Sequence, residues 1–345
     1  MSHVCNRMLT IQEITNKKIW EDFITLVAYG FPPFFQTWNW GEVQKKHGTE
    51  IWRLGLYQDA SLIGIMSVTL INAKRGTYLH LRHGPVLKEY KKEYIDFLIQ
   101  FLAEKGKKKN ASFIRVSPLI SEQNAVRIFP SSKFKNAKIH AMDAEVCWVL
   151  PLTNSEEEIL RNMRKSHRYL IKKSQTSGVE IERTENVSKI KEFLPLYTKL
   201  AHRKHFVAHK GVEEEFLVFS HNHQALLFLA YYEKKVIAGA LIDFVDGMAI
   251  YRHSASDEQY RHIPAMYLLQ WEVIKEAKKR GMKIYNFWGI APNESKKHPW
   301  YGLTLFKTGF GGEKREFTHA KDYILRFGYW KIWAIESITK LRKGY

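Results

Sequence analysis

The sequence predicts an α/β protein built from two copies of one β-β-β-α-β unit. Short runs in which apolar and polar residues alternate are typical of strands, and in each half a charged segment with helical spacing follows them. The same order of elements recurs about 170 residues later. The recurrence is visible when LYQDASLIGIMSV (56–68) is compared with AYYEKKVIAGALI (230–242), and HLRHGP (80–85) with IYRHSA (250–255).

The order of elements predicts two domains. In the first half we expect strands at 9–13, 52–57, 62–70, 78–82 and 113–116, and helices at 17–28, 38–46 and 91–105. In the second half we expect strands at 227–232, 236–244, 249–253 and 284–288, and a helix at 266–279. The first domain is assigned to 1–150 together with 316–345, whose C-terminal helix packs back on it, and the second domain to 151–315.

The composition restricts the class of protein and of partner. Lys and Arg outnumber Asp and Glu by 54 to 35, and the formal net charge is +19. This surplus favours a polyanionic partner such as RNA, DNA, a nucleotide-linked substrate or an anionic membrane surface. No apolar run approaches the ~20 residues of a membrane span, and the first residues lack the apolar segment of a signal peptide. Because only Cys5 and Cys147 are present, we expect a protein of the reducing cytoplasm.

A single basic helix is predicted over 154–178. Asn154 or Ser155 begins it, three glutamates in its first turn favour the positive end of the helix dipole, and Gly178 ends it. Its basic residues recur at helical spacing and form a stripe of one sign: Arg161, Arg164, Lys165, Arg168 and Lys172. The stripe is interpreted either as a surface for a phosphate backbone or as an ordinary solvated face.

The stretch from Tyr285 to Gly312 contains the candidate catalytic residues. A short buried strand stops at Gly289, and a polar loop then leads to Phe306 and Lys307 before a glycine cluster. A lysine in a partly dry pocket stabilises the oxyanion that forms when a carbonyl is attacked. The alternative interpretation is a surface lysine between core phenylalanines.

Other kinds of site find less support. The GNAT acetyltransferase fold, which the β-β-β-α-β order resembles, holds coenzyme A on bare amides before a helix, but Pro264 lies there and has no N–H. We therefore expect no cofactor. His205 and His209 are four residues apart without a recognisable third ligand, so no metal site is expected. Asp243 and Asp246 are possible acids or bases, and nothing in the sequence points to either.

The C-terminal segment is predicted to form an amphipathic helix. Its apolar face contains Tyr329, Ile332, Trp333, Ile335, Ile338 and Leu341, and its polar side contains Lys331, Lys340, Arg342 and Lys343. Packing on the first domain explains the apolar face. Peripheral contact with the inner face of the plasma membrane is the alternative for the tip of the helix.

Five stretches together resemble the Fem family of peptidoglycan bridge-forming enzymes. They are FFQTWNWGEVQKKHG (34–48), FIRVSP (113–118), NMRKSHRYLIKKSQTSGVEIE (162–182), the region 251–290, and HPWYGLTLFKTGFGG (298–312). The resemblance implies two tandem GNAT-like domains in the compact form of the family, without a coiled-coil arm. It also implies transfer of an amino acid from aminoacyl-tRNA to an amine of a peptidoglycan precursor. A Phe-Lys pair lies at the reaction centre of that family and matches Phe306 and Lys307.

The positions that contact the substrate in the family differ here. In the member that uses a nucleotide-linked precursor, the contacts are a lysine, an aspartate, an arginine and two tyrosines. The matching positions and their neighbours in this chain are Gln44 with Lys45, Ser117, His209 or Lys210, Glu215, and His253 with Tyr251. We count Lys45, Tyr251, His253, His209, Lys210 and Trp300 as substrate-binding candidates. The departures favour a lipid-linked muropeptide or another amine over the nucleotide-linked muropeptide.

Two alternatives stay open at this point. One is an N-acyltransferase that uses acyl-CoA or another acyl carrier, and a thermal shift with coenzyme A but none with charged tRNA would favour it. The other is a non-catalytic relative that binds RNA or membranes, for which binding with a steep salt dependence and no turnover is expected. No stable protein partner is expected.

Overall fold

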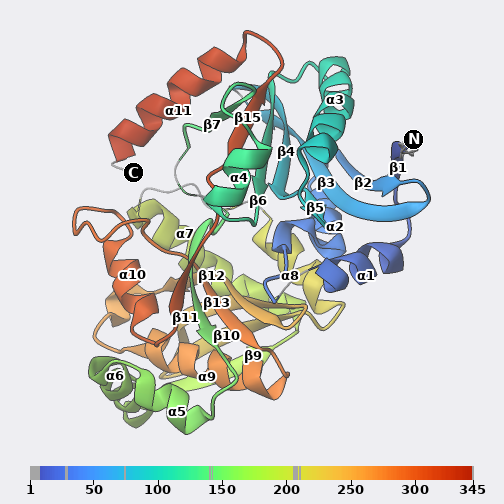
Figure 1. Ribbon diagram of the computed structural model, residues 1–345. Coiled ribbons are helices and arrows are strands. Elements are labelled where there is room, and N and C mark those ends of the chain that lie inside the picture. Colours follow the sequence, from blue (N-terminus) through green and yellow to red (C-terminus); the bar gives the residue numbers. More distant parts are fainter. Residues whose placement is uncertain are drawn as a thin grey trace. The chain divides into compact units, whose positions relative to one another are not determined.

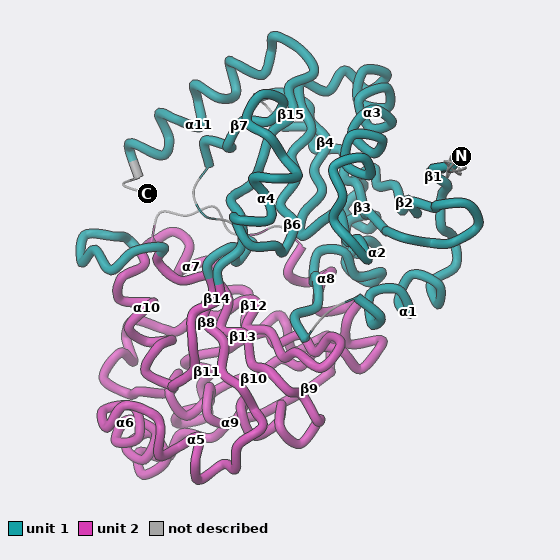
Figure 2. The backbone as a smooth tube through the Cα atoms, viewed as in Figure 1, with its two compact units in different colours: residues 1–146, 292–299, 316–345 teal, residues 147–291, 300–315 magenta. Residues whose placement is uncertain are grey.

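The computed structural model describes residues 8–27, 30–73, 75–139, 141, 143–204, 209 and 211–343. The chain forms two compact units, shown in different colours in Figure 2. Unit 1 contains residues 1–146, 292–299 and 316–345, and unit 2 contains residues 147–291 and 300–315. Each unit is built on one mixed β-sheet with helices packed against it (Figure 1). The predicted α/β class is confirmed.

The sheet of unit 1 has the strand order β1-β2-β3-β4-β6-β15-β7, and β5 pairs with β3. Its strands are β1 (Leu9–Glu13), β2 (Ile51–Gln58), β3 (Ser61–Ala73), β4 (Gly76–His83), β5 (Val86–Leu87), β6 (Phe113–Pro118), β7 (Phe134–Asn136) and β15 (Lys321–Ile324). Strands β4 and β6 are parallel and remain paired to the end of both strands, at His83 and Pro118. The C-terminal part of the chain contributes β15, which pairs antiparallel with β6 and β7.

Helices cover both faces of this sheet. They are α1 (Lys17–Val27), α2 (Trp38–Lys46), α3 (Lys92–Lys108), α4 (Glu122–Ile128) and α11 (Tyr329–Lys343), with a 3-10 turn η1 (Phe34–Gln36). Alternation along β6 directs Ile114 into the core beneath α3 and Phe113 toward Tyr329 of α11. Buried Arg115 binds Asp322 of β15 (2.7 and 2.8 Å) and Glu336 of α11 (3.0 and 2.9 Å), which fixes α11 to the sheet.

The sheet of unit 2 has the order β14-β8-β13-β12-β11-β10-β9. Its strands are β8 (Val146–Pro151), β9 (Glu180–Thr184), β10 (Ala225–Tyr232), β11 (Lys235–Val245), β12 (Met248–Ser256), β13 (Ile284–Gly289) and β14 (Glu313–Glu316). Its helices are α5 (Glu156–Asn162), α6 (Lys165–Thr176), α7 (Ile190–Lys204), α8 (Val212–Ser220), α9 (Ala265–Lys279) and α10 (Tyr301–Thr308), with 3-10 turns η2 (Val187–Lys189) and η3 (Glu258–Tyr260).

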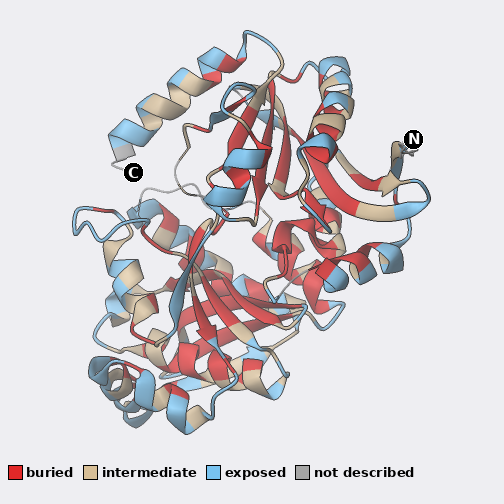
Figure 3. Ribbon diagram, in the orientation of Figure 1, coloured by how far each residue is buried: buried red, intermediate tan, exposed pale blue. Residues whose placement is uncertain are grey.

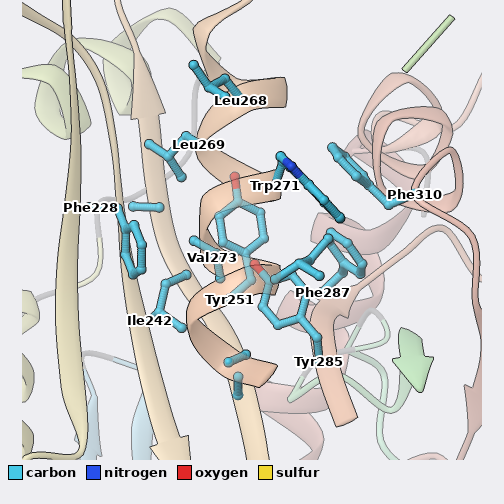
Figure 4. Packing of buried hydrophobic residues seen from close by; sticks show 14 of the residues in the cluster. Phe228, Ile242, Tyr251, Leu268, Leu269, Trp271, Val273, Tyr285, Phe287 and Phe310 are labelled. Carbon is cyan, nitrogen blue, oxygen red and sulfur yellow. The ribbon is translucent and has the colours of Figure 1, made fainter. Parts of the chain in front are cut away.

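The core of unit 2 lies between the sheet and α9. Strands β10 to β13 are almost wholly buried along their middle (Figure 3). Figure 4 shows Trp271 and Val273 of α9 packed among Tyr251, Tyr285, Phe287 and Phe310. Because Phe310 directly follows the glycine after α10, this core anchors the end of that helix. Within the described residues, no helix has both the length and the apolar character needed to cross a membrane.

The single basic helix expected over 154–178 is wrong, because the structure has two helices there. Ser155 and Glu158 form a reciprocal capping box that begins α5, but α5 ends at Asn162 and Met163 has an extended backbone. The Arg164 N–H donates to the Gly309 carbonyl (2.9 Å) instead of continuing the helix. The break therefore depends on a partner about 145 residues away, which local spacing does not encode.

Candidate active site

The two central parallel strands of unit 2 separate before they end. Pairing between β12 and β13 stops at Ile250 and Asn286, although the strands continue to Ser256 and Gly289. In unit 1 the corresponding parallel pair stays closed to its last residues. An opening between parallel strands exposes backbone groups and side chains from both strands to a third element. In unit 2 that element is α10.

Lys307 of α10 enters this region and is buried, with 4% of its surface exposed. Its Nζ donates a hydrogen bond to the Gly289 carbonyl (2.6 Å) and lies 5.8 Å from the centroid of the Tyr251 ring. Burial lowers the pKa of Lys307 from its ordinary 10.5 to about 7, an effect that Cys147 opposes slightly. The amine therefore exchanges between its charged and neutral forms near neutral pH.

Helix α10 is held by the junction between α5 and α6. The Arg164 guanidinium donates to the Leu305 carbonyl (3.0 Å) and to Thr308 Oγ1 (2.8 Å). A ring nitrogen of buried His167 lies 2.9 Å from the Phe306 carbonyl. Gly309 is required there because a Cβ would lie 1.9 Å from the His167 ring. His167 was missed in the sequence, since a lone histidine in a basic helix carries no signal of this contact.

A pocket of about 310 Å³ in unit 2 adjoins these residues. Tyr251 and Ser254 of β12, Tyr267 of α9 and Phe306 of α10 are part of its lining. Pro264 precedes α9 as its N-cap and also lines the pocket, so the amide that would hold a pyrophosphate is absent there. The pocket thus combines aromatic walls, a hydroxyl-bearing strand and Arg261, and its lining residue Tyr251 lies close to the Lys307 amine.

The remaining substrate-binding candidates lie in different surroundings. Buried His253 has a ring nitrogen 3.2 Å from Glu215 Oε2, and exposed His209 has its ring centroid 5.5 Å from that of His253. Trp300 occupies the N-cap position of α10, without a capping hydrogen bond from its side chain. Lys45 lies in unit 1, half exposed and 3.3 Å from Glu42 Oε1. Lys210 lies outside the described residues.

The candidate tRNA-binding residues divide into two groups. Arg161, Lys165 and Lys172 extend into solvent. Arg168 donates instead to the carbonyls of Arg161 (2.7 Å) and Met163 (2.6 Å), so it caps α5, and Arg164 is bound to α10. Tyr169, which sequence reasoning missed, is 63% exposed on α6, four residues from Lys165 and three from Lys172. An exposed aromatic ring among cations is typical of surfaces on which nucleic-acid bases stack.

Comparison with known proteins identifies relatives along most of the chain. Residues 21–145, 132–212 and 213–319 match the model of the FemAB family. A lipid II:glycine glycyltransferase from Staphylococcus haemolyticus is 34% identical over 89 residues, which are 26% of this chain and 21% of that protein. Aminoacyltransferase FemA from Staphylococcus epidermidis is 31% identical over 68 residues, 20% of this chain and 16% of that protein. The matches span about a fifth of the length of these relatives.

Solved structures share the fold across almost the entire chain. The crystal structure of FemX matches with a TM-score of 0.78 and 17% identity, and covers 95% of this chain and 100% of that one. A tandem GNAT protein from the clavulanic acid biosynthesis pathway matches with a TM-score of 0.57 and 10% identity, and covers 92% and 97% of the two chains. The fold is therefore that of tandem GNAT-like proteins.

Burial of Lys307 gives a prediction about stability. Between pH 7 and 10.5 the unfolded chain holds a proton on this lysine that the folded chain lacks, so stability rises with pH in this window and the full cost of burial applies below pH 7. Lys307→Met is expected to be more stable than the wild type at pH 6–7, by a few kcal/mol at most. The difference is expected to shrink toward pH 10. Urea unfolding of both proteins at several pH values measures it, with exposed Lys173→Met as control. A difference that does not vary with pH contradicts the burial of a titrating amine.

Proposed function

Because the chain belongs to the FemAB family, we propose that it transfers an amino acid from aminoacyl-tRNA to an amine of a peptidoglycan precursor. The observation that carries this proposal is Lys307, a buried amine at the opening between β12 and β13, beside a pocket walled by Phe306. The names of the staphylococcal relatives, a lipid II:glycine glycyltransferase and an aminoacyltransferase, support a reaction of this class. They also favour a lipid-linked precursor.

The chemistry needs an acceptor amine and a place for negative charge. A neutral amine of the stem peptide attacks the ester carbonyl, an amide bond forms, the ester bond breaks, and the tRNA ribose hydroxyl leaves with a proton. In its charged form Lys307 donates a hydrogen bond to the oxyanion that develops on the carbonyl. The Gly289 carbonyl orients the amine, and the pocket beside Phe306 holds the aminoacyl group in position.

The first test is a transfer assay. Purified protein is incubated with labelled aminoacyl-tRNAs and with two acceptors, the nucleotide-linked and the lipid-linked muropeptide. We expect transfer with preference for the lipid-linked form, and about a 100-fold or greater loss in Lys307→Ala, because one oxyanion donor typically contributes that much. Exposed Lys107→Ala of unit 1, away from the proposed tRNA surface, is the control. Normal transfer by Lys307→Ala refutes its catalytic role, and transfer from acyl-CoA alone favours the acyl-carrier alternative.

We assign tRNA binding to the exposed face of α5 and α6. Arg161, Lys165 and Lys172 provide charge for phosphates, and Tyr169 provides a ring for stacking. Arg164 and Arg168 support this surface indirectly through their contacts with α10 and α5. The acceptor-binding roles of Lys45, Tyr251, His253, His209, Lys210 and Trp300 belong to the same proposal.

Charge reversal tests this surface. Replacing Arg161, Lys165 and Lys172 by Glu is expected to weaken tRNA binding at least tenfold and to reduce the salt dependence of affinity by about two to three released ions. Arg168 is left intact because its loss would uncap α5. Filter binding at several salt concentrations measures both quantities. Reversal of Lys18, Lys107 and Lys108 is the control, and equal effects of the two triple variants contradict a local surface.

A groove in unit 1 supports peripheral membrane contact. It has a volume of about 500 Å³ and is lined by aromatic residues, among them Trp330 and Trp333 of α11, and by Lys135 and Lys138. Lys321 and Glu122 also line it and bind each other (2.7 Å). Beside it the C-terminal segment exposes large apolar side chains: Phe327 (86%), Trp330 (42%), Ile338 (50%) and Leu341 (82%). Indole rings and lysines in combination favour the interface of an anionic bilayer. We propose an anionic phospholipid as the occupant.

Vesicle binding tests the groove. The wild type is expected to sediment with vesicles of phosphatidylcholine and phosphatidylglycerol and much less with phosphatidylcholine alone. Lys135→Glu with Lys138→Glu is expected to lower partitioning on the order of 30-fold or more, because each lysine contributes about 1 kcal/mol near an anionic surface. Trp330→Ser and deletion of 338–345 are expected to lower it as well. Lys107→Glu with Lys108→Glu is the control, and unchanged sedimentation of the groove variants refutes the proposal.

A further inference from the structure

A buried pair of carboxyl groups lies beneath the opening of unit 2. Asp243 of β11 is fully buried, and Glu215 of α8 is almost so. Glu215 accepts two hydrogen bonds from the Arg252 guanidinium (2.8 and 3.1 Å) and lies 3.2 Å from a ring nitrogen of His253. Asp243 has only a longer approach, 3.7 Å from its Oδ2 to Arg252 Nε. One arginine therefore faces two acids.

The surroundings of Asp243 fit a protonated acid. No hydrogen-bond donor of the described residues reaches either of its oxygens, and Asp243 and Glu215 approach the same Arg252 Nε, at 3.7 and 2.8 Å. Burial and the charge of Glu215 raise the pKa of Asp243 well above its usual range. Burial also works against ionisation of Glu215, but Arg252 and His253 hold its pKa well below the usual range. These opposite directions favour a proton on Asp243 and a negative charge on Glu215.

A β-bulge directs Arg252 toward this pair. Leu241 pairs with His253 and Ile242 pairs with Tyr251, so Arg252 is the extra residue on β12. In a regular strand the side chains of Arg252 and His253 would point to opposite faces, and the bulge allows both to contact Glu215. The other titratable groups around His253 are Tyr197 of α7 and His209, whose rings lie 5.7 and 5.5 Å from it.

Arg252 connects the acids to the site of Lys307. Its guanidinium lies 4.8 Å from the centroid of the Trp288 ring. Trp288 has a φ of +67°, a strained conformation for a bulky residue, and its N–H donates to Asn286 Oδ1 (2.8 Å). The next residue is Gly289, whose carbonyl accepts the hydrogen bond of Lys307.

We propose that Glu215 and Asp243 form a proton-sharing pair that, through Arg252 and Trp288, positions the Gly289 carbonyl against Lys307. These four residues are positioning residues, because none of them touches the reacting atoms. An effect of this pair on catalysis rests on the proposed function. Its effect on the Lys307 amine does not depend on that function.

Replacing Asp243 and Glu215 singly and together tests the proposal. In Asp243→Asn the amide N–H replaces the acid O–H as donor to Glu215. In Glu215→Gln the remaining acid, Asp243, loses its proton and supplies the negative charge. Each single variant is therefore expected to keep Lys307 within half a pH unit of its wild-type midpoint. The double variant removes both acids of the pair from Arg252. It is expected to release Trp288, to hydrate the Lys307 amine, and to raise the midpoint of the Lys307 titration by more than one pH unit.

The readout is titration of lysine side chains labelled with ¹³C at Cε, followed by NMR without any substrate. The Lys307 signal is identified by its absence in Lys307→Met. Arg252→Lys keeps the charge but loses the two-pronged guanidinium contact with Glu215 and the stacking on Trp288. It is expected to shift the Lys307 midpoint in the same direction, and it replaces the double variant in the test if that variant does not fold. A folded double variant with an unshifted midpoint overturns the positioning role, and Asp243→Asn as severe as the double variant overturns the shared proton.

The transfer assay separates this inference from the proposed function. If the wild type transfers an amino acid, kcat is expected to fall more than tenfold in the double variant. If the wild type transfers nothing to either acceptor, the proposed function fails. The titration of Lys307 still decides the inference in that case.

Discussion

Burial of one amine is the constraint on which the rest of unit 2 depends. A lysine at 4% exposure loses the hydration of its charged form, so the surrounding protein has to supply partners and hold them still. Its hydrogen-bond acceptor is a backbone carbonyl, Gly289, which becomes available because β12 and β13 separate. Helix α10 carries the lysine and is bound on its outer side by Arg164 and His167. The strand opening and the helix junction therefore serve the same side chain.

Regular elements of the fold could be predicted from the sequence, and the reason is periodicity. Runs such as 62–70 and 236–244 alternate or are apolar throughout, and they form β3 and β11. The short strands β14 and β15 were not predicted. All four residues of β14 are exposed, and β15 begins with Lys321 and Asp322, which read as polar loop residues. Their burial depends on Glu122 and Arg115, about 200 residues away in the chain.

Parts of the candidate site that depend on local sequence could be predicted, and parts that depend on contacts between distant residues could not. The family is confirmed. Phe306 and Lys307 were singled out first from the pattern of the stretch 285–312 and again through the family resemblance, and their catalytic role is a proposal. Pro264 at the start of α9 has no N–H to donate to a pyrophosphate. This could be predicted because it depends on the residue type alone. The acids beneath the opening left no such signal. Asp243 looks like any strand residue in sequence, and its meaning arises only when a bulge brings Arg252 and a separate helix brings Glu215.

An Arg-His pair occurs in both units and makes similar contacts in each. In unit 1, Arg82 donates to buried Asp143 (2.9 Å) and lies 3.4 Å from the Phe35 ring centroid, and a ring nitrogen of His83 lies 2.6 Å from the Asp143 carbonyl. In unit 2, Arg252 and His253 likewise join a buried acid to an aromatic ring.

The difference between the copies lies in the neighbouring strand. Pairing to the end of β6 closes the first copy, whereas the bulge beside Arg252 and the early end of pairing open the second. A pair of residues that only stabilises a closed sheet in one copy can therefore orient a backbone carbonyl in the other.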